Sequence, residues 1–135
     1  MVNKMTHILI SKLGLDGHDR GAKLVAHALK HAGMDVTYLG IRHTVSQVVD
    51  TAIKTRVDYV GLSFLAGDHM TLVRKLVQEL KERQADNIKL IVGGIIMQDH
   101  VPELKSMGVQ HVFLPGTPLT EIVNYIQKDS ATQNT

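Results

Sequence analysis

The sequence predicts an α/β domain built on a doubly wound, five-stranded parallel sheet. Three observations predict this class: apolar strand-like runs alternate with amphipathic helical patterns five times, two of those runs are almost continuously apolar, and 135 residues suit a single domain. Strict alternation of strands and helices requires right-handed crossovers and a parallel sheet with helices on both faces. Strands that are covered on both faces are expected to be apolar throughout.

The first three strands are predicted at residues 6–11, 35–39 and 57–64, where apolar residues run together. The helix after the first strand is expected to end before Gly33, because glycine suits the position just past a helix end. Helices are expected where apolar residues recur with the spacing of one helical face. These faces consist of Val25, Ala26, Leu29 and Ala32, then Val45, Val48, Val49, Ala52 and Ile53, and then Val73, Leu76, Val77 and Leu80.

The last two strands are predicted at residues 88–92 and 109–114, with a short helix near 99–107 between them. The last helix is expected to face the core with Leu119, Ile122, Val123 and Ile126. The domain is expected to span residues 1–128, and residues 129–135 are expected to form a polar, frayed tail. Five such units resemble the flavodoxin-like strand order 2-1-3-4-5, in which ligands bind beyond the carboxyl ends of the strands.

Composition argues against several functional classes. The net charge is +2, the charges are scattered and aromatic residues make up 4%, so we expect no nucleic-acid partner. The absence of cysteine excludes a disulfide framework, a thiolate metal site and a cysteine nucleophile, and it fits a cytoplasmic protein. No apolar run approaches transmembrane length, so we expect no membrane partner.

Unusual segments follow four of the predicted strands: GLDGHDRG, SFLAGDH, GGIIMQD and LPGT. Because the carboxyl ends of parallel strands meet at one edge, all four are expected to open on the same rim. Gly61 interrupts one strand and Gly93 and Gly94 end another, which lets a backbone or a ligand approach closely, although turn geometry alone also explains such glycines. The hydroxyls of Ser63 and Thr117 stand at strand ends, where solvation or helix capping is the alternative.

His18 is the candidate working group of the first segment. Asp16 precedes it by two residues, and in an extended segment the two side chains point the same way, so the carboxylate can reach one imidazole nitrogen. Such a contact fixes the tautomer and makes the other nitrogen a better metal donor. The alternative is helix capping, which is open to both Asp16 and Asp19.

One histidine is too few for a protein-built zinc site. The other seven histidines are expected to be solvated surface groups. The chain carries no Walker motif or dinucleotide fingerprint, and no serine–histidine–aspartate set is apparent.

Taken in order, DGHDRG, SFL, GG and PGT resemble the cobalamin-binding domain of adenosylcobalamin-dependent acyl-CoA mutases, the methylmalonyl-CoA mutase family. The resemblance spans about residues 6–127. The corrin ring gives cobalt four nitrogens, so a single histidine is then sufficient. The resemblance implies that His18 replaces the cofactor's own dimethylbenzimidazole as the lower axial ligand of cobalt. It also implies that Asp16 is hydrogen-bonded to His18 and that Lys12 pairs with Asp16.

The resemblance further implies where the displaced nucleotide tail lies. Ser63 and Leu65 match a Ser-x-Leu motif that lines the slot for the tail, and Gly93 and Gly94 match glycines that make room for it. The other positions implied to contact the cofactor are Gly17, Asp19, Arg20 and Gly21, beneath the corrin, and Gly116 and Thr117, in the turn after the fifth strand. Met97 departs from the pattern, because it stands where the family has a proline.

These implications predict the small subunit of a two-component mutase that uses adenosylcobalamin. The chain contains no substrate-binding barrel, so we expect a large barrel-type subunit that binds the acyl-CoA, and no turnover without it. Methylmalonyl-, isobutyryl- and 2-hydroxyisobutyryl-CoA are then distinguished by that large subunit.

Two alternatives stay open. A corrinoid methyl carrier shares the Asp-x-His-x-x-Gly loop, but such carriers have a helical bundle before the domain, and about five residues precede the first strand here. A non-catalytic cobalamin-binding module is the other alternative, although such modules usually carry an output domain. A phosphoreceiver domain shares the topology, yet HILISKLG lacks the acidic pair that ends its first strand.

Overall fold

The computed structural model describes all residues except 1–4, 14–19, 65–68, 95 and 134–135. The strands are β1 (His7–Leu13), β2 (Asp35–His43), β3 (Tyr59–Phe64), β4 (Lys89–Gly94) and β5 (Val109–Phe113). The helices are α1 (Arg20–His31), α2 (Val45–Thr55), α3 (His69–Glu82), the 3₁₀ helix η1 (Gln98–His100), α4 (Val101–Ser106) and α5 (Leu119–Gln133). All strand pairs are parallel, in the order β2-β1-β3-β4-β5, which confirms the predicted fold class.

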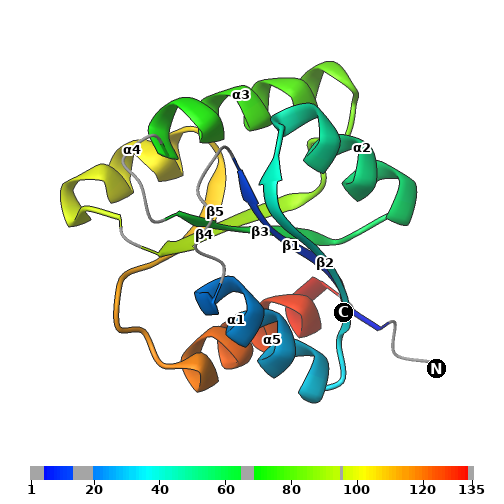
Figure 1. The fold of residues 1–135 in the computed structure, drawn as a ribbon, viewed down its shortest axis with the longest axis vertical. Helices are drawn as coiled ribbons and strands as arrows, with labels where there is room; N and C mark the ends of the chain where they lie inside the picture. Colours follow the sequence, from blue (N-terminus) through cyan, green and yellow to red (C-terminus); the bar gives the residue numbers. More distant parts are fainter. Residues whose placement is uncertain (1–4, 14–19, 65–68, 95, 134–135) are drawn as a thin grey trace.

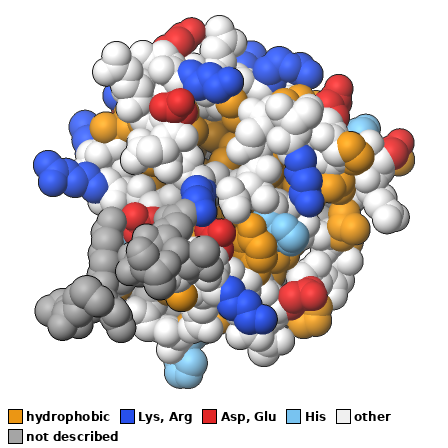
Figure 2. Space-filling model, turned by 180° about the vertical axis from the view of Figure 1, so that it is seen from behind, with side chains coloured by type: hydrophobic (Ala, Val, Ile, Leu, Met, Phe, Trp, Pro, Cys, Tyr) orange, Lys and Arg blue, Asp and Glu red, His pale blue; other side chains and the backbone are white. Residues whose placement is uncertain are grey.

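The sheet separates two layers of helices (Figure 1). Helices α2, α3 and α4 cover one face, and α1 and α5 cover the other. Acidic and basic side chains are interspersed on the side of the molecule that Figure 2 shows. No helix within the described ranges is long and apolar enough to cross a membrane.

Local signals set several of the helix boundaries. Gly33 follows α1 with a φ of +98°, as its position predicts. Helix α2 begins with a capping box, in which the Thr44 hydroxyl accepts from the Gln47 amide N–H and the Gln47 side chain accepts from the Thr44 N–H. The helix predicted near 99–107 is divided into η1 and α4, with Pro102 in the first turn of α4, where a missing N–H costs nothing.

The face of the sheet beneath α1 and α5 changes from its amino half to its carboxyl half. Side chains alternate between the two faces along a strand, and on this face β3 presents Tyr59, then Gly61, then Ser63. Strand pairing sets Gly61 between Ile10 of β1 and Ile91 of β4. The large tyrosine ring therefore fills the amino half, while the absent and short side chains leave space in the carboxyl half.

A polar network closes the amino half. The Tyr59 hydroxyl and the Lys89 ammonium both donate to Asp129 Oδ2, at 2.5 and 2.8 Å. Burial raises the pKa of Tyr59, and the neighbouring carboxylate raises it further. Burial also acts to raise the pKa of Asp129, but the hydrogen bonds from Lys89 and Tyr59 outweigh it and hold that pKa below its ordinary value.

This network explains where the last helix ends. Helix α5 continues to Gln133, through the stretch that the sequence predicts to be a frayed tail. Asp129 anchors the helix to the starts of β3 and β4 by accepting from Tyr59 and Lys89. The hydroxyls of Ser130 and Thr6 are hydrogen-bonded to each other. Tertiary contacts thus order a segment whose own composition is polar.

Candidate functional site

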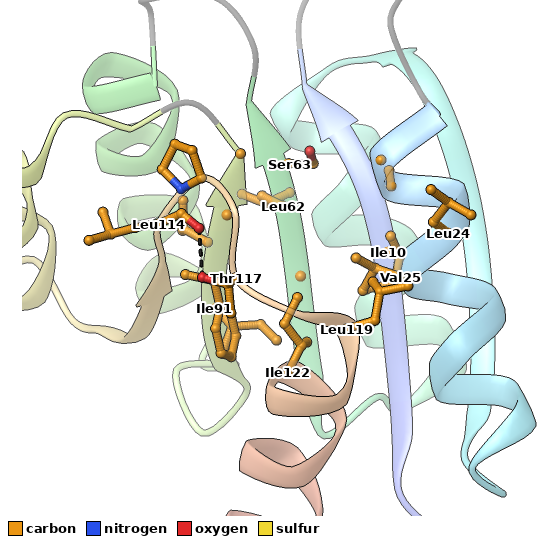
Figure 3. A pocket seen from close by; sticks show the side chains of 18 of the residues that line it. Ile10, Leu24, Val25, Leu62, Ser63, Ile91, Leu114, Thr117, Leu119 and Ile122 are labelled. Carbon is orange, nitrogen blue, oxygen red and sulfur yellow. Dashed lines mark hydrogen bonds between the residues drawn. The ribbon is translucent and has the colours of Figure 1, made fainter.

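A cavity of about 310 Å³ lies between the carboxyl half of the sheet and helices α1 and α5 (Figure 3). Ile10 of β1, Val25 of α1, Ile91 of β4 and Ile122 of α5 contribute apolar walls. Gly61 forms part of the floor: a Cβ placed on it would lie 2.7 Å from Ile10 Cδ1 and 3.5 Å from Ile91 Cγ1. The ends of the Ile10 and Ile91 side chains thus take the room directly above Gly61, and a larger residue at this position would displace them.

The two glycines at the end of β4 differ in what their missing side chains allow. A Cβ on Gly93 would make ordinary contacts of 3.7 Å with Phe113, so this position tolerates a methyl group. A Cβ on Gly94 would lie 2.0 Å from the Phe64 carbonyl oxygen, and Gly94 has a φ of +103°. Both residues line the cavity, but the room beside Gly94 is occupied by the backbone of β3.

A tight turn after β5 forms another wall of the cavity. Pro115 and Gly116 occupy its centre, and Gly116 has a φ of +86°, which the third position of a type II turn requires. The Thr117 hydroxyl and amide both donate to the Leu114 carbonyl oxygen, at 2.6 and 3.2 Å. Thr117, a position that the resemblance implies to contact the cofactor, thus uses its hydroxyl to close its own turn.

Lys12 is a buried cation at the end of β1. It is 2% exposed, and its Nζ donates to the Ser63 carbonyl oxygen at 3.3 Å. Because a buried ammonium group requires acceptors, this bond fixes Lys12 where β1 leads into residues 14–19. The pairing with Asp16 that the resemblance implies lies outside the described residues.

A histidine pair stands near the same edge, on the other face of the sheet. His69 is 3% exposed, and its Nε2 lies 2.9 Å from His100 Nδ1. The prediction that all the other histidines are solvated is therefore wrong for His69. Its position in the first turn of α3 packs the ring against Phe64, with centroids 5.9 Å apart.

Most of the predicted site residues that the structure describes meet at the cavity. They are Gly21, Ser63, Gly93, Gly94, Gly116 and Thr117. Asp16, Gly17, His18, Asp19 and Leu65 lie outside the described residues. Arg20 is the first residue of α1, but its side chain is also outside the described part. Met97 is 62% exposed, just before η1.

Sequence reasoning missed the apolar side chains that shape the cavity. Ile10 and Ile91 look like ordinary strand core, and Ile122 looks like ordinary helix core. Leu119, predicted to face the core, is 37% exposed and lines the cavity. The available signal was the series of side chains on one face of β3, where the large Tyr59 is followed by Gly61 and then by the small Ser63.

The arrangement is suited to holding a flat, largely apolar ring. The walls are hydrocarbon, and the polar side chains in them are those of Ser63 and Thr117. The described residues contain no group of three or more potential metal ligands, so they do not form a protein-built metal site. Among the described residues, the cavity therefore offers a ligand mainly apolar contacts.

Comparisons with known proteins show which family the sequence matches. Residues 6–123 match the family model described as the B12 binding domain. The chain is 42% identical to the 2-hydroxyisobutanoyl-CoA mutase small subunit of Aquincola tertiaricarbonis, over 89% of this chain and 88% of that protein. It is 40% identical to the pivalyl-CoA mutase small subunit of Xanthobacter autotrophicus, over 88% of this chain and 80% of that protein.

Among solved structures, a cobalamin-binding protein from Desulfitobacterium hafniense superimposes with a TM-score of 0.80. The sequence identity is 24%, and the match covers 93% of this chain and 59% of that one. At this identity the likeness establishes a shared fold.

Proposed function

Because this chain belongs to the family of B12-binding domains, we propose that it is the cobalamin-binding small subunit of a two-component, adenosylcobalamin-dependent acyl-CoA mutase. The observation that carries the proposal is the apolar cavity between the carboxyl halves of β1, β3 and β4 and helices α1 and α5. Its apolar lining and its volume of about 310 Å³ suit the heteroaromatic base of a displaced cobalamin tail, and the carboxyl edge of the sheet is where doubly wound sheets bind ligands.

Residues of the cavity and of the segment after β1 then have separate roles in holding the cofactor. The cavity holds the tail base against the side chains of Ile10, Ile91 and Ile122. His18 would hold the cobalt through its imidazole, and Asp16 would orient that imidazole through a hydrogen bond. Lys12, held by the Ser63 carbonyl oxygen, links this loop to the wall of the cavity.

When bound, adenosylcobalamin supplies a radical by cleavage of its cobalt–carbon bond. The contribution of this chain is to bind and orient. One edge of one sheet would cover only part of the cofactor, so we propose that a large barrel-type subunit covers the rest and binds the acyl-CoA there. Exclusion of water from the radical then depends on the assembled pair.

Binding of cobalamin with its tail in the cavity is tested by comparing cobalamin with cobinamide, which lacks the tail. Gly93→Val should weaken cobalamin by ~10-fold or more, about 1.4 kcal/mol, and leave cobinamide unchanged, because valine occupies the space for the base. Val123→Ala on α5, away from the cavity lining, is the matched control. Equal losses for both ligands would place the tail elsewhere.

The role of His18 has a spectroscopic test. Electron paramagnetic resonance of the protein with the Co(II) form of cobalamin should show an axial nitrogen hyperfine pattern that changes when the histidines carry nitrogen-15. His18→Ala should abolish that response. A pattern indifferent to labelling would contradict axial ligation by histidine.

The subunit role is tested by reconstitution. The chain should show no turnover alone and should gain it with a barrel-type large subunit, assayed with methylmalonyl-, isobutyryl-, 2-hydroxyisobutyryl- and pivalyl-CoA. Analytical ultracentrifugation should show tighter association with adenosylcobalamin, because a ligand shared by two proteins strengthens their contact. Turnover by this chain alone would refute the two-component assignment, and methyl transfer in place of rearrangement would indicate a methyl carrier.

A further inference from the structure

We infer that the cavity selects the tail base of its corrinoid, taking benzimidazole-type bases and rejecting purines. The inference rests on the proposed function and adds a ligand class to it. It follows from the few polar groups in the described lining and from the hydrogen bonds that some of them already make within the protein.

The deep walls offer no polar side-chain atom to a base. Ile10, Ile91 and Ile122 are 3%, 4% and 9% exposed, and their hydrocarbon side chains converge from β1, β4 and α5 (Figure 3). Val25 of α1 closes the same space from the helix side. A base that enters here exchanges water for hydrocarbon on most of its surface.

Most of the polar groups described at the rim already form hydrogen bonds within the protein. The Thr117 hydroxyl donates to the Leu114 carbonyl oxygen, and the Ser63 carbonyl oxygen accepts from Lys12. The Ser63 hydroxyl makes no hydrogen bond within the part of the chain that the structure describes. Among the described lining side chains, Ser63 thus supplies the one uncommitted hydroxyl.

One hydroxyl matches the polar content of a benzimidazole. Once displaced from cobalt, this base exposes a single polar atom, the ring nitrogen that had bound the metal, and the rest of its edge is hydrocarbon. Adenine in the same place carries an exocyclic amino group and several ring nitrogens. Most of these would lie against Ile10, Ile91 and Ile122 without a partner. Buried polar groups without hydrogen bonds cost binding free energy, so the purine is disfavoured.

The test measures equilibrium binding of three corrinoids that differ only in the tail: cobalamin, the corrinoid with adenine as its base, and cobinamide. We expect cobalamin to bind ~10- to 100-fold more tightly than the adenine-tailed corrinoid. Equal affinity for the two tailed corrinoids, both above cobinamide, would overturn the inference and leave the proposed function standing. Equal affinity for all three would instead count against insertion of the tail.

A pair of isosteric variants tests whether the cavity wall is the cause. Val25→Thr places a hydroxyl in the lining without changing its shape, and Val123→Thr makes the same change on α5 away from the lining. Val25→Thr should reduce the ratio of the affinities for cobalamin and for the adenine-tailed corrinoid several-fold, whereas Val123→Thr should leave this affinity ratio unchanged. Ile91→Thr, deeper in the wall, should narrow the ratio as well, and circular dichroism reports whether each variant folds. An unchanged ratio in folded Val25→Thr and Ile91→Thr would refute the role of the wall.

Discussion

The two halves of the sheet face beneath α1 and α5 are built in opposite ways. In the amino half, Tyr59, Lys89 and Asp129 form a closed polar network that holds α5 to the sheet. In the carboxyl half, Gly61 and its neighbours leave a cavity with apolar walls. The same strands thus supply rigidity at one end and space at the other.

The difference separates the residues that stabilise the fold from those that hold a ligand. Filled space contributes to stability through burial and satisfied hydrogen bonds, whereas an empty apolar cavity forgoes that contribution. Substitutions in the amino half should therefore lower the free energy of unfolding and leave cobalamin affinity unchanged. Substitutions in the carboxyl half should weaken cobalamin binding and leave the free energy of unfolding nearly unchanged. The exception is a glycine whose backbone conformation or close backbone contact allows no side chain.

Gly94 is that exception, and it gives the largest expected effect. In Gly94→Ala, the new Cβ would lie 2.0 Å from the Phe64 carbonyl oxygen, at a φ of +103° that L-residues rarely adopt. We expect the free energy of unfolding to fall by more than about 4 kcal/mol, or folding to be lost, as measured by urea unfolding.

Gly93→Ala is the matched control, because its Cβ would meet Phe113 at 3.7 Å. We expect this variant to stay within about 1 kcal/mol of the parent. Equal destabilisation of the two variants would contradict the separate roles given to these adjacent glycines.

The amino half should respond next. Asp129→Ala removes the acceptor shared by Tyr59 and Lys89, and we expect it to cost about 2–3 kcal/mol of unfolding free energy. Tyr59→Phe removes one donor and leaves the bond from Lys89 to Asp129, so we expect about 1 kcal/mol. Both variants should bind cobalamin as the parent does, and a large loss of affinity in either would break the division between the two halves.

The smallest expected effect is a dependence on pH. The pKa of Asp129 is held below its ordinary value of 3.8, so the folded state favours the ionised carboxylate. Its stabilising contribution is complete above that ordinary pKa and is lost as pH falls through the folded-state pKa. Urea unfolding between about pH 6 and pH 3 should show a shallower loss for Asp129→Asn than for the parent. Identical slopes would indicate that Asp129 titrates as it does in the unfolded chain.

Much of the architecture was determined by the sequence, because its signals are local. The period of apolar residues predicted five strands and the helical faces, the resemblance to flavodoxin-like folds predicted the order of the sheet, and Gly33 marked the end of α1. Strand ends in a parallel sheet share one edge, so the motifs also indicated where the site lies. Six of the predicted site residues do line one cavity.

Only the tertiary structure decided what each of these residues touches. Gly93 and Gly94 are neighbours in sequence, yet the register of β4 against β3 sets one beside a cavity and the other against the Phe64 backbone. The Thr117 hydroxyl is used in its own turn, and Asp129 is drawn into a network with β3 and β4. These contacts join segments far apart in the chain, and the periodicity of one segment carries no information about the register of another.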